Sequence, residues 1–531
     1  MDTRCTSASF FSLTAPPSRT RHSVVLALAA TIAGTLTACG GGSPASQTGG
    51  PVVPLPPVTQ LRGQPVGAAS LVPAAVGGFS VNTVQPAQMK ALVEASVSYG
   101  AAVTGTPTCA VTTYTLRYHT LDGKAADTQA STAIMVPSGT DPACQGGRPV
   151  LLYAHGTSVL KNNDMADLSA TETRTVAAMF AAQGYIVVAP NYAGYAGSSL
   201  DYHPYLDASQ QANDMIDALR AARSVFASIG ATPSSRLMVS GYSQGGFVAM
   251  ATQRAMQRDY AGEFNVTAAA PLSGPYALLQ FGDTIFNGAP SVGSTGFMPM
   301  LITAGQRAGA GLYSSLTDLY EAKYASGIDT LLPGSLSLGA LVTAGKLPND
   351  VLFDLASLPQ AAGYSRFFGT DHLLQTAYRN SYLSDLKAQP CNASNNAPLN
   401  CAPTHTLRKW LLKNDLRNYT PTVPLLLCGG NQDPVVPFAN TDAAVAYFRA
   451  QNMGTGLLSV LDLDDSSLLA DYRTVRTEFA LAKQVLKLSV TEQGGTNAQA
   501  NQVVLDSYHA GLVAPFCLRE ARKFFDAAPV R

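Results

Sequence analysis

Short apolar runs alternate with helical segments along the middle of the chain. In the longer segments apolar side chains recur every three or four residues, whereas the short runs are apolar throughout. Strands are therefore expected at 149–154, 185–189, 237–240 and 266–270, and helices at 169–183, 207–229 and 246–258. Apolar strands separated by helices predict an α/β fold, with a mostly parallel sheet covered by helices on both faces.

The segments before this region have a different pattern. Residues 84–98 have helical spacing, and residues 110–118 and 130–136 alternate between apolar and polar positions. Two alternating runs close together in the chain predict an antiparallel pair, which we expect at an edge of the sheet.

A long interruption follows Pro275. Residues 276–420 are mainly helical and glycine-rich, and a strand pattern returns only at 423–428. We therefore expect one sheet domain, formed by residues 73–275 and 421–531, with a helical cap inserted at 276–420 before the later strand.

The N-terminus has the pattern of an export signal. Arginines precede the apolar run 23–36, which is too short to span a bilayer comfortably. The run ends in Leu-Thr-Ala-Cys39, which resembles the lipobox of bacterial lipoproteins, in which the cysteine becomes the lipidated first residue. We expect a lipoprotein-type signal peptide at 1–38 and lipidation at Cys39. The alternative is an ordinary cleaved signal, with Cys39 incidental.

The residues after Cys39 indicate where the protein would be held. Gly40 stands where an aspartate would resemble an inner-membrane retention signal, so we expect an anchor in outer-membrane lipid, with full secretion as the alternative. Residues 39–72 are rich in glycine, proline and serine and predict a flexible linker.

Composition excludes several other classes of function. Apolar residues make up 46% of the chain and charged residues 13%, which suits a large core and not a disordered chain. Basic and acidic residues are equal in number, so nothing favours nucleic acid as a partner. No CxxC or HExxH pattern indicates a metal site, and we expect no cofactor and a monomer.

Export makes six further cysteines candidates for disulfides. Six cysteines allow 15 pairings. Proximity along the chain favours Cys109–Cys144 and Cys391–Cys401, which leaves Cys428–Cys517 as a long-range pair.

The most informative motif is Gly241-Tyr-Ser243-Gln-Gly245, which lies between a predicted strand and a predicted helix. The pattern G-x-S-x-G in this context is typical of a nucleophile elbow, in which a tight turn exposes the serine hydroxyl at the N-terminus of a helix. The amides of that helix can stabilise negative charge. We therefore predict that Ser243 is a nucleophile. The alternative is a serine that caps a helix after a glycine turn.

A serine nucleophile needs a base and an acid that orients the base. With the chain order serine, acid, histidine, only His372, His405 and His509 can be the base. Because the first two lie in the insertion, we predict His509. Asp433 follows the strand at 423–428 directly and is the predicted acid. Asp462, Asp464 and Asp465 are its rivals.

The oxyanion hole requires two amide donors. The amide after the nucleophile belongs to Gln244. The loop after an earlier strand contains His155-Gly-Thr157, where the Thr157 amide is the second candidate and Ser158 an alternative. His155 itself is expected to have a structural role.

These motifs resemble those of the α/β-hydrolase family. The resemblance rests on HGT, GYSQGG, GGNQDPVVP and YHAG and covers most of 105–275 and 421–525. The combination is also similar to the secretory lipase (lipase A-like) branch, which carries a helical cap before the acid-bearing strand. The resemblance implies a serine esterase or lipase acting on apolar acyl esters, lipids or polyesters. The alternatives are a serine peptidase of the same fold and a non-catalytic lipoprotein that binds apolar ligands.

Overall fold

The computed structural model describes residues 61–95, 100–391, 394–467 and 471–529. The predicted signal peptide and Cys39 lie outside the described residues. Within the described residues, no helix combines the length and apolarity needed to cross a membrane.

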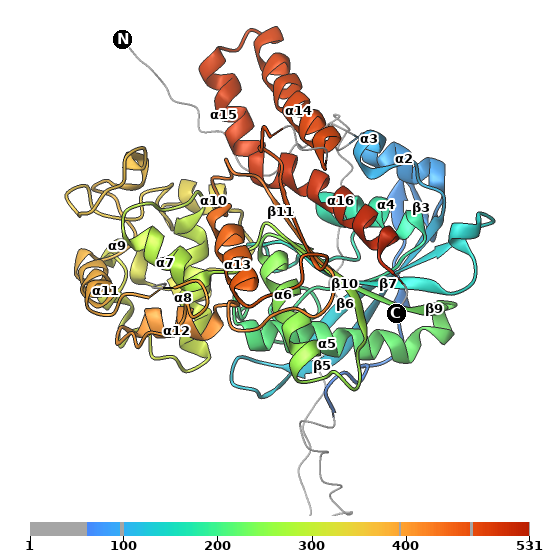
Figure 1. Ribbon diagram of the computed structural model, residues 1–531, viewed down its shortest axis with the longest axis horizontal. Helices are drawn as coiled ribbons and strands as arrows, with labels where there is room; N and C mark the ends of the chain where they lie inside the picture. The colour runs from blue at the N-terminus through green and yellow to red at the C-terminus, as the bar shows by residue number, and fades with distance from the viewer. Residues whose placement is uncertain (1–60, 96–99, 392–393, 468–470, 530–531) are drawn as a thin grey trace, which may run out of the picture.

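One twisted sheet forms the centre of the molecule, with the strand order β1-β5-β6-β8-β7-β9-β10-β11-β12, and β4 pairs separately with β5 (Figure 1). The strands from β8 through β12 are parallel, whereas β5 and β6 form the predicted antiparallel pair. The strands of this sheet span Ser70–Leu71 (β1), Thr83–Val84 (β4), Ala110–Leu121 (β5), Asp127–Ser138 (β6), Arg148–Ala154 (β7), Ile186–Pro190 (β8), Pro233–Tyr242 (β9), Val266–Leu272 (β10), Leu425–Gly429 (β11) and Leu458–Asp462 (β12). A small hairpin of β2 (Ala74–Val76) and β3 (Phe79–Val81) lies apart from it.

Helices cover both faces of the sheet, as the apolar strands predict. On one face, α5 (Ala208–Val225) and α6 (Gln244–Arg258) pack on the strands with α13 (Ala439–Ala450). The other face carries α2 (Pro86–Glu94), α3 (Gly100–Thr104), α4 (Thr171–Met179) and α16 (Ala514–Ala527).

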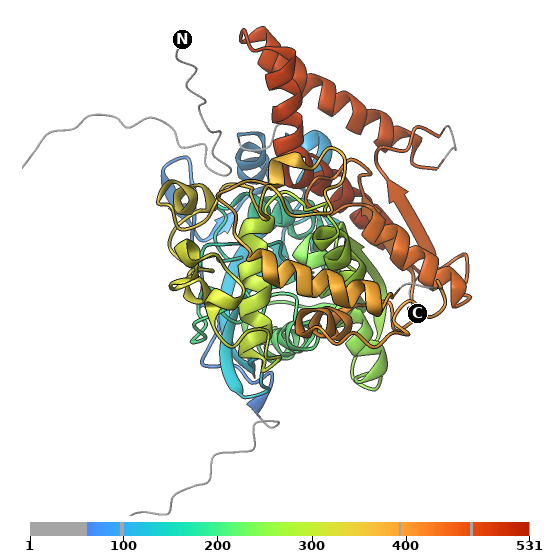
Figure 2. The same cartoon turned by 90° about the vertical axis from the view of Figure 1, so that its left-hand side faces the viewer.

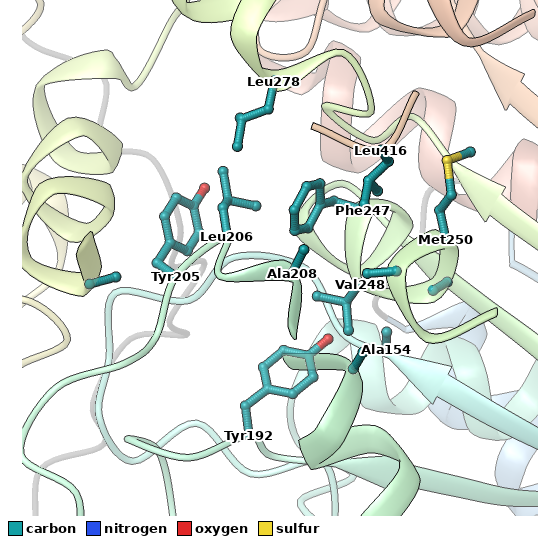
Figure 3. Packing of buried hydrophobic residues seen from close by; sticks show 14 of the residues in the cluster. Ala154, Tyr192, Tyr205, Leu206, Ala208, Phe247, Val248, Met250, Leu278 and Leu416 are labelled. Carbon is teal, nitrogen blue, oxygen red and sulfur yellow. The ribbon is translucent and has the colours of Figure 1, made fainter. Parts of the chain in front are cut away.

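Each central strand therefore contributes to two cores. In β7, Leu152 faces the first core and Leu151 the second, and both side chains are fully buried. Figure 3 shows part of the first core, where Phe247 and Val248 of α6 lie near Ala154 of β7.

The segment between β10 and β11 is mainly helical and lies beside the core on the left of Figure 1. Its described residues form only isolated β-bridges. Apolar faces of its helices join the first core, among them Leu278, which Figure 3 places near Leu206. The helices are α7 (Leu278–Phe286), α8 (Ser294–Arg307), α9 (Ala322–Ala325), α10 (Leu338–Thr343), α11 (Thr376–Ala388) and α12 (Thr406–Asn414).

The prediction of a flexible linker up to residue 72 is wrong for residues 61–72. Ser70 and Leu71 pair with β5, and the backbone of Val66 bonds to Arg117. Arg62 donates to the buried carboxylate of Asp217 at 3.0 Å. The proline- and glycine-rich composition concealed these contacts, because an edge strand of two residues has no recognisable pattern.

The structure pairs the six cysteines as proximity predicts, with disulfides Cys109–Cys144, Cys391–Cys401 and Cys428–Cys517. The third joins β11 to α16 across 89 residues of sequence.

Between β12 and α16 the chain forms a helical hairpin that the sequence pattern did not predict. Its arms are α14 (Arg473–Glu492) and α15 (Asn497–Ser507), and both project from the body of the molecule (Figures 1 and 2). A π-helical segment, Tyr508–Val513, connects α15 to α16 and contains His509.

Candidate active site

Ser243 lies at the sharp turn between β9 and α6. Its φ of 62° is in the left-handed region, which is unfavourable for a residue with a side chain and is often found at functional sites. The turn depends on the flanking glycines, because a Cβ on Gly245 would lie 1.9 Å from the carbonyl oxygen of Ala154. A Cβ on Gly241 would lie 2.3 Å from the carbonyl oxygen of Gly245. The motif thus forms the strand–turn–helix that the sequence predicts.

His509 and Asp433 meet although 76 residues separate them. Nδ1 of His509 lies 2.6 Å from Oδ2 of Asp433. Because a carboxylate only accepts hydrogen bonds, Nδ1 carries the proton and Nε2 is the basic nitrogen.

The carboxylate of Asp433 is held from three other directions. Its Oδ1 accepts from the amides of Val435 at 2.9 Å and Val436 at 3.1 Å, and its Oδ2 accepts from the hydroxyl of Ser273 at 3.1 Å. The side chain has no exposed surface. These donors fix the orientation of the carboxylate.

The ring of His509 lies against the residue that precedes Ser243. Its centroid is 4.9 Å from that of Tyr242, whose hydroxyl donates to the carbonyl oxygen of His509 at 2.6 Å. Burial and the nearby Asp433 raise the pKa of Tyr242 well above its usual value, so this phenol remains a donor. Among the described residues, Nε2 of His509 has no hydrogen-bond partner, and it makes no such bond to Ser243. Catalytic hydrogen bonds of this kind often form only when substrate is bound.

The two residues predicted to supply the oxyanion donors line the same pocket as Ser243. Gln244 opens α6, so its amide is among the first-turn groups that have no partner within the helix. The amide of Gly156 is already used, because it donates to Glu172 at 2.9 Å. This leaves the next residue, Thr157, whose hydroxyl pairs with that of Tyr205 at 3.1 Å. His155 packs on Tyr192 at 4.1 Å, in keeping with a structural role.

Ser243, Gln244 and Thr157 line one pocket, which has a cavity volume of about 70 Å³. The rest of its wall is largely apolar and comes mostly from α7, α8 and α12 of the insertion, and no charged side chain lines it. The insertion residues are Leu278, Phe281, Gly282, Ile285, Phe286, Ser291, Ser294, Phe297, Met298, Leu301, Leu407 and Leu411.

Sequence reasoning missed several residues that support this site. Ser273 and Tyr242 contact the triad candidates only through the tertiary fold. His203 contacts the side chain of Gln244, because its Nε2 accepts a hydrogen bond from the Gln244 side-chain amide at 2.6 Å. One signal was available, since Ser273 follows a predicted core strand and therefore lies at the same sheet edge as Ser243. Among the described residues, no group of three or more potential metal ligands lies together.

The fold and this arrangement define a serine hydrolase of the α/β-hydrolase fold. The model of the prolyl oligopeptidase family matches residues 171–269, which include the elbow. No curated protein matches the chain in sequence.

Solved structures give the closer comparisons. The ligand-bound rice cell wall degrading esterase LipA from Xanthomonas oryzae is 26% identical, with a TM-score of 0.61, over 76% of this chain and 91% of that one. A Legionella pneumophila protein assigned as a hydrolase is 19% identical, with a TM-score of 0.60, over 87% of this chain and 97% of that one. Candida antarctica lipase A is 15% identical, with a TM-score of only 0.45, over 83% of this chain and 84% of that one. The expected resemblance to α/β-hydrolase esterases is confirmed.

Proposed function

We propose that this protein is a carboxylic ester hydrolase that acts on apolar acyl esters through Ser243, His509 and Asp433. The observation that carries the proposal is the pocket, in which the serine and both oxyanion candidates share a wall with apolar side chains of the insertion. Such a wall suits an acyl chain, and the similarity to an esterase supports ester over amide chemistry.

In the proposed mechanism, Oγ of Ser243 attacks the ester carbonyl carbon while Nε2 of His509 takes its proton. The amides of Gln244 and Thr157 stabilise the oxyanion of the tetrahedral intermediate. His509 then gives its proton to the leaving alcohol, and an acyl-serine remains. Water, activated by the same histidine, releases the acid and restores the serine. Asp433 holds the imidazole in the required tautomer throughout.

The decisive test uses Ser243→Ala and p-nitrophenyl butyrate. We expect kcat to fall by about 10⁴-fold or more, because the nucleophile is lost. The exposed Ser228 supplies the control variant, Ser228→Ala, which should match the wild type. A fluorophosphonate probe should label the wild type and the control but not Ser243→Ala. Turnover by Ser243→Ala at the wild-type rate would refute the proposal, and absence of labelling in the wild type would favour a non-catalytic binding protein.

Chain-length preference tests the substrate class. Burying each added methylene in the pocket contributes about 0.8 kcal/mol, so kcat/KM should rise by up to fourfold per carbon from acetate towards octanoate. A strong preference for acetate would contradict the assignment of an acyl-binding pocket.

The family match supplies one specific reason to consider a peptidase. Activity on aminoacyl-nitroanilides that exceeds activity on esters would favour it. Against it, the pocket wall has no acidic side chain that could bind the amine of a peptide.

Export is supported by the three disulfides, which are typical of oxidising compartments. We further propose that Cys39 is lipidated and anchors the enzyme in the outer membrane. Metabolic labelling with an alkynyl fatty acid should mark the wild type but not Cys39→Ser, and equal labelling of both would contradict the anchor.

A further inference from the structure

A buried carboxylate contacts the residues that precede the candidate acid and the candidate base in the sequence. Asp464 follows β12, and its side chain is 5% exposed. Its Oδ2 accepts from the backbone amide of Gln432 at 3.1 Å and from the hydroxyl of Tyr508. Its Oδ1 pairs with Lys483 of α14. Both oxygens are therefore used, and the negative charge is neutralised.

The two groups that Oδ2 holds are the residues immediately before Asp433 and His509. Gln432 precedes Asp433 in the loop after β11, and Tyr508 precedes His509 at the start of the π-helical segment. The amide of Gln432 also lies 3.3 Å from the hydroxyl of Tyr508. One carboxylate thus connects the backbone of the acid loop to the segment that carries the base.

The fit around this junction is close. Tyr508 is 1% exposed, and its ring packs edge-on against Phe479 of α14 at 5.9 Å. A Cβ on Gly430 would lie 2.3 Å from the Tyr508 hydroxyl, so this glycine leaves the space that the tyrosine needs. The loop and the π-helical segment therefore meet in one defined arrangement.

Asp464 does not itself replace Asp433 as the acid. Nδ1 of His509 bonds to Asp433, and both oxygens of Asp464 face other donors. Its neighbour Asp462 likewise accepts a backbone amide, that of Asn431. Asp462 and Asp464 therefore act on the loop and not on the histidine ring.

We infer that Asp464 is a positioning residue, which sets the Asp433–His509 hydrogen bond by holding Gln432 and Tyr508 together. Lys483 supplies the charge that allows this carboxylate to be buried, so the helical hairpin contributes to the site from outside the pocket. The inference rests on the function proposed above. Misplacing a catalytic pair by about 1 Å costs up to about 100-fold in rate.

The test compares Asp464→Asn with Asp465→Asn. Asparagine at 464 presents an N–H to a donor in place of one oxygen, which weakens the junction. Asp465 is the matched control, because its carboxylate pairs with Arg476 and Ser467 and contacts none of the three triad candidates. We expect Asp464→Asn to lower kcat about 10- to 100-fold per active site counted with a fluorophosphonate, with KM within about twofold of the wild type. Asp465→Asn should leave both constants unchanged.

A spectroscopic readout separates positioning from general stability. A short histidine–carboxylate hydrogen bond gives a proton signal far downfield in the NMR spectrum, and this signal should shift or broaden in Asp464→Asn. Tyr508→Phe removes only the hydroxyl and should show the same two effects more weakly. It also keeps the test available if Asp464→Asn fails to fold. In the variant that combines Asp464→Asn with Tyr508→Phe, the fold-loss in kcat should be less than the product of the two single fold-losses.

Two outcomes would overturn the inference. In the first, kcat and the downfield signal of Tyr508→Phe and Asp464→Asn stay at wild-type values. In the second, activity falls only in proportion to the number of labelled sites. Failure of the proposed function would look different, because the wild type would then lack esterase activity or Ser243→Ala would retain it.

Discussion

At the scale of single residues, the site depends on which ring nitrogen of each histidine donates a hydrogen bond and which accepts one. His203 illustrates this, because its Nδ1 lies 2.9 Å from the carbonyl oxygen of Ala193 and therefore carries the proton. Nε2 is left as the acceptor for the side chain of Gln244. Burial lowers the pKa of His203 to about 3, so the ring stays neutral and keeps this polarity over a wide pH range.

The lowered pKa of His203 predicts a pH dependence of stability. In the unfolded chain the histidine titrates near 6.5, whereas the folded protein resists protonation down to about 3. Its contribution is therefore complete above pH 6.5 and is lost as the pH falls towards 3, by up to a few kcal/mol. His203→Gln should show a flatter fall in the free energy of unfolding between pH 6.5 and 4, measured by urea denaturation. His119→Gln, at a partly exposed histidine, is the control. Parallel curves for the wild type and His203→Gln would contradict this account.

Sequence alone could identify the candidate catalytic residues, because their types and order are constrained. Ser243, Asp433 and His509 each follow a recognisable strand or motif. The supporting residues could not be found in this way. Ser273 and Tyr242 act through contacts with residues 160 and 267 positions away, and their side chains are common types in ordinary sequence surroundings.

At the scale of elements, two connections bring the acid and the base together. β11 leads into the Asp433 loop, and α16 follows the segment with His509. The Cys428–Cys517 disulfide joins these two elements, so it constrains the same region as the contacts of Asp464. Cys391–Cys401 closes a loop of 10 residues within the insertion.

The two disulfides should therefore differ in effect. Loop-closure entropy assigns roughly 4–5 kcal/mol to a cross-link that spans 89 residues and roughly 2–3 kcal/mol to one that spans 10. Replacing both Cys428 and Cys517 by alanine should lower the free energy of unfolding more than the same change at Cys391 and Cys401. Only the first change should also lower kcat. Urea denaturation and esterase assays measure these effects, and equal losses in both variants would argue against the predicted difference.

The central strands that the sequence predicted are buried on both sides. β7, β8, β9 and β10 read as apolar runs because each lies inside the sheet. β12 was missed because four of its five residues are only partly buried at the edge of the sheet. The hairpin helix α14 was missed because apolar residues such as Leu481 and Leu488 lie on its exposed surface, which obscures the helical pattern.

At the scale of the whole molecule, the first described residues belong to the folded domain. Arg62 reaches the buried carboxylate of Asp217 and also donates to Asn213 and Tyr260. Burial raises the pKa of Asp217, and the charge of Arg62 opposes that rise. The segment before β1 thus stabilises an ionised group within α5, more than 150 residues away.

Removing this arginine should destabilise the domain. In Arg62→Met, Asp217 keeps Arg220 and Thr120 as partners, so we expect a loss of about 1–3 kcal/mol in the free energy of unfolding at pH 7. Without Arg62 the pKa of Asp217 in the folded state rises further, so stability is lost as the pH increases through it. The deficit should therefore be smaller at pH 4 than at pH 7.

Lys90→Met supplies the control, because Lys90 and Glu94 form an exposed pair whose loss should change stability by less than about 0.5 kcal/mol. Urea denaturation at both pH values measures the two variants. If Arg62→Met matched Lys90→Met at pH 7, the contacts of Arg62 would contribute no more to stability than an exposed ion pair, and the prediction would be wrong. A larger deficit at pH 7 than at pH 4 would instead identify the buried carboxylate as the group that makes this segment part of the domain.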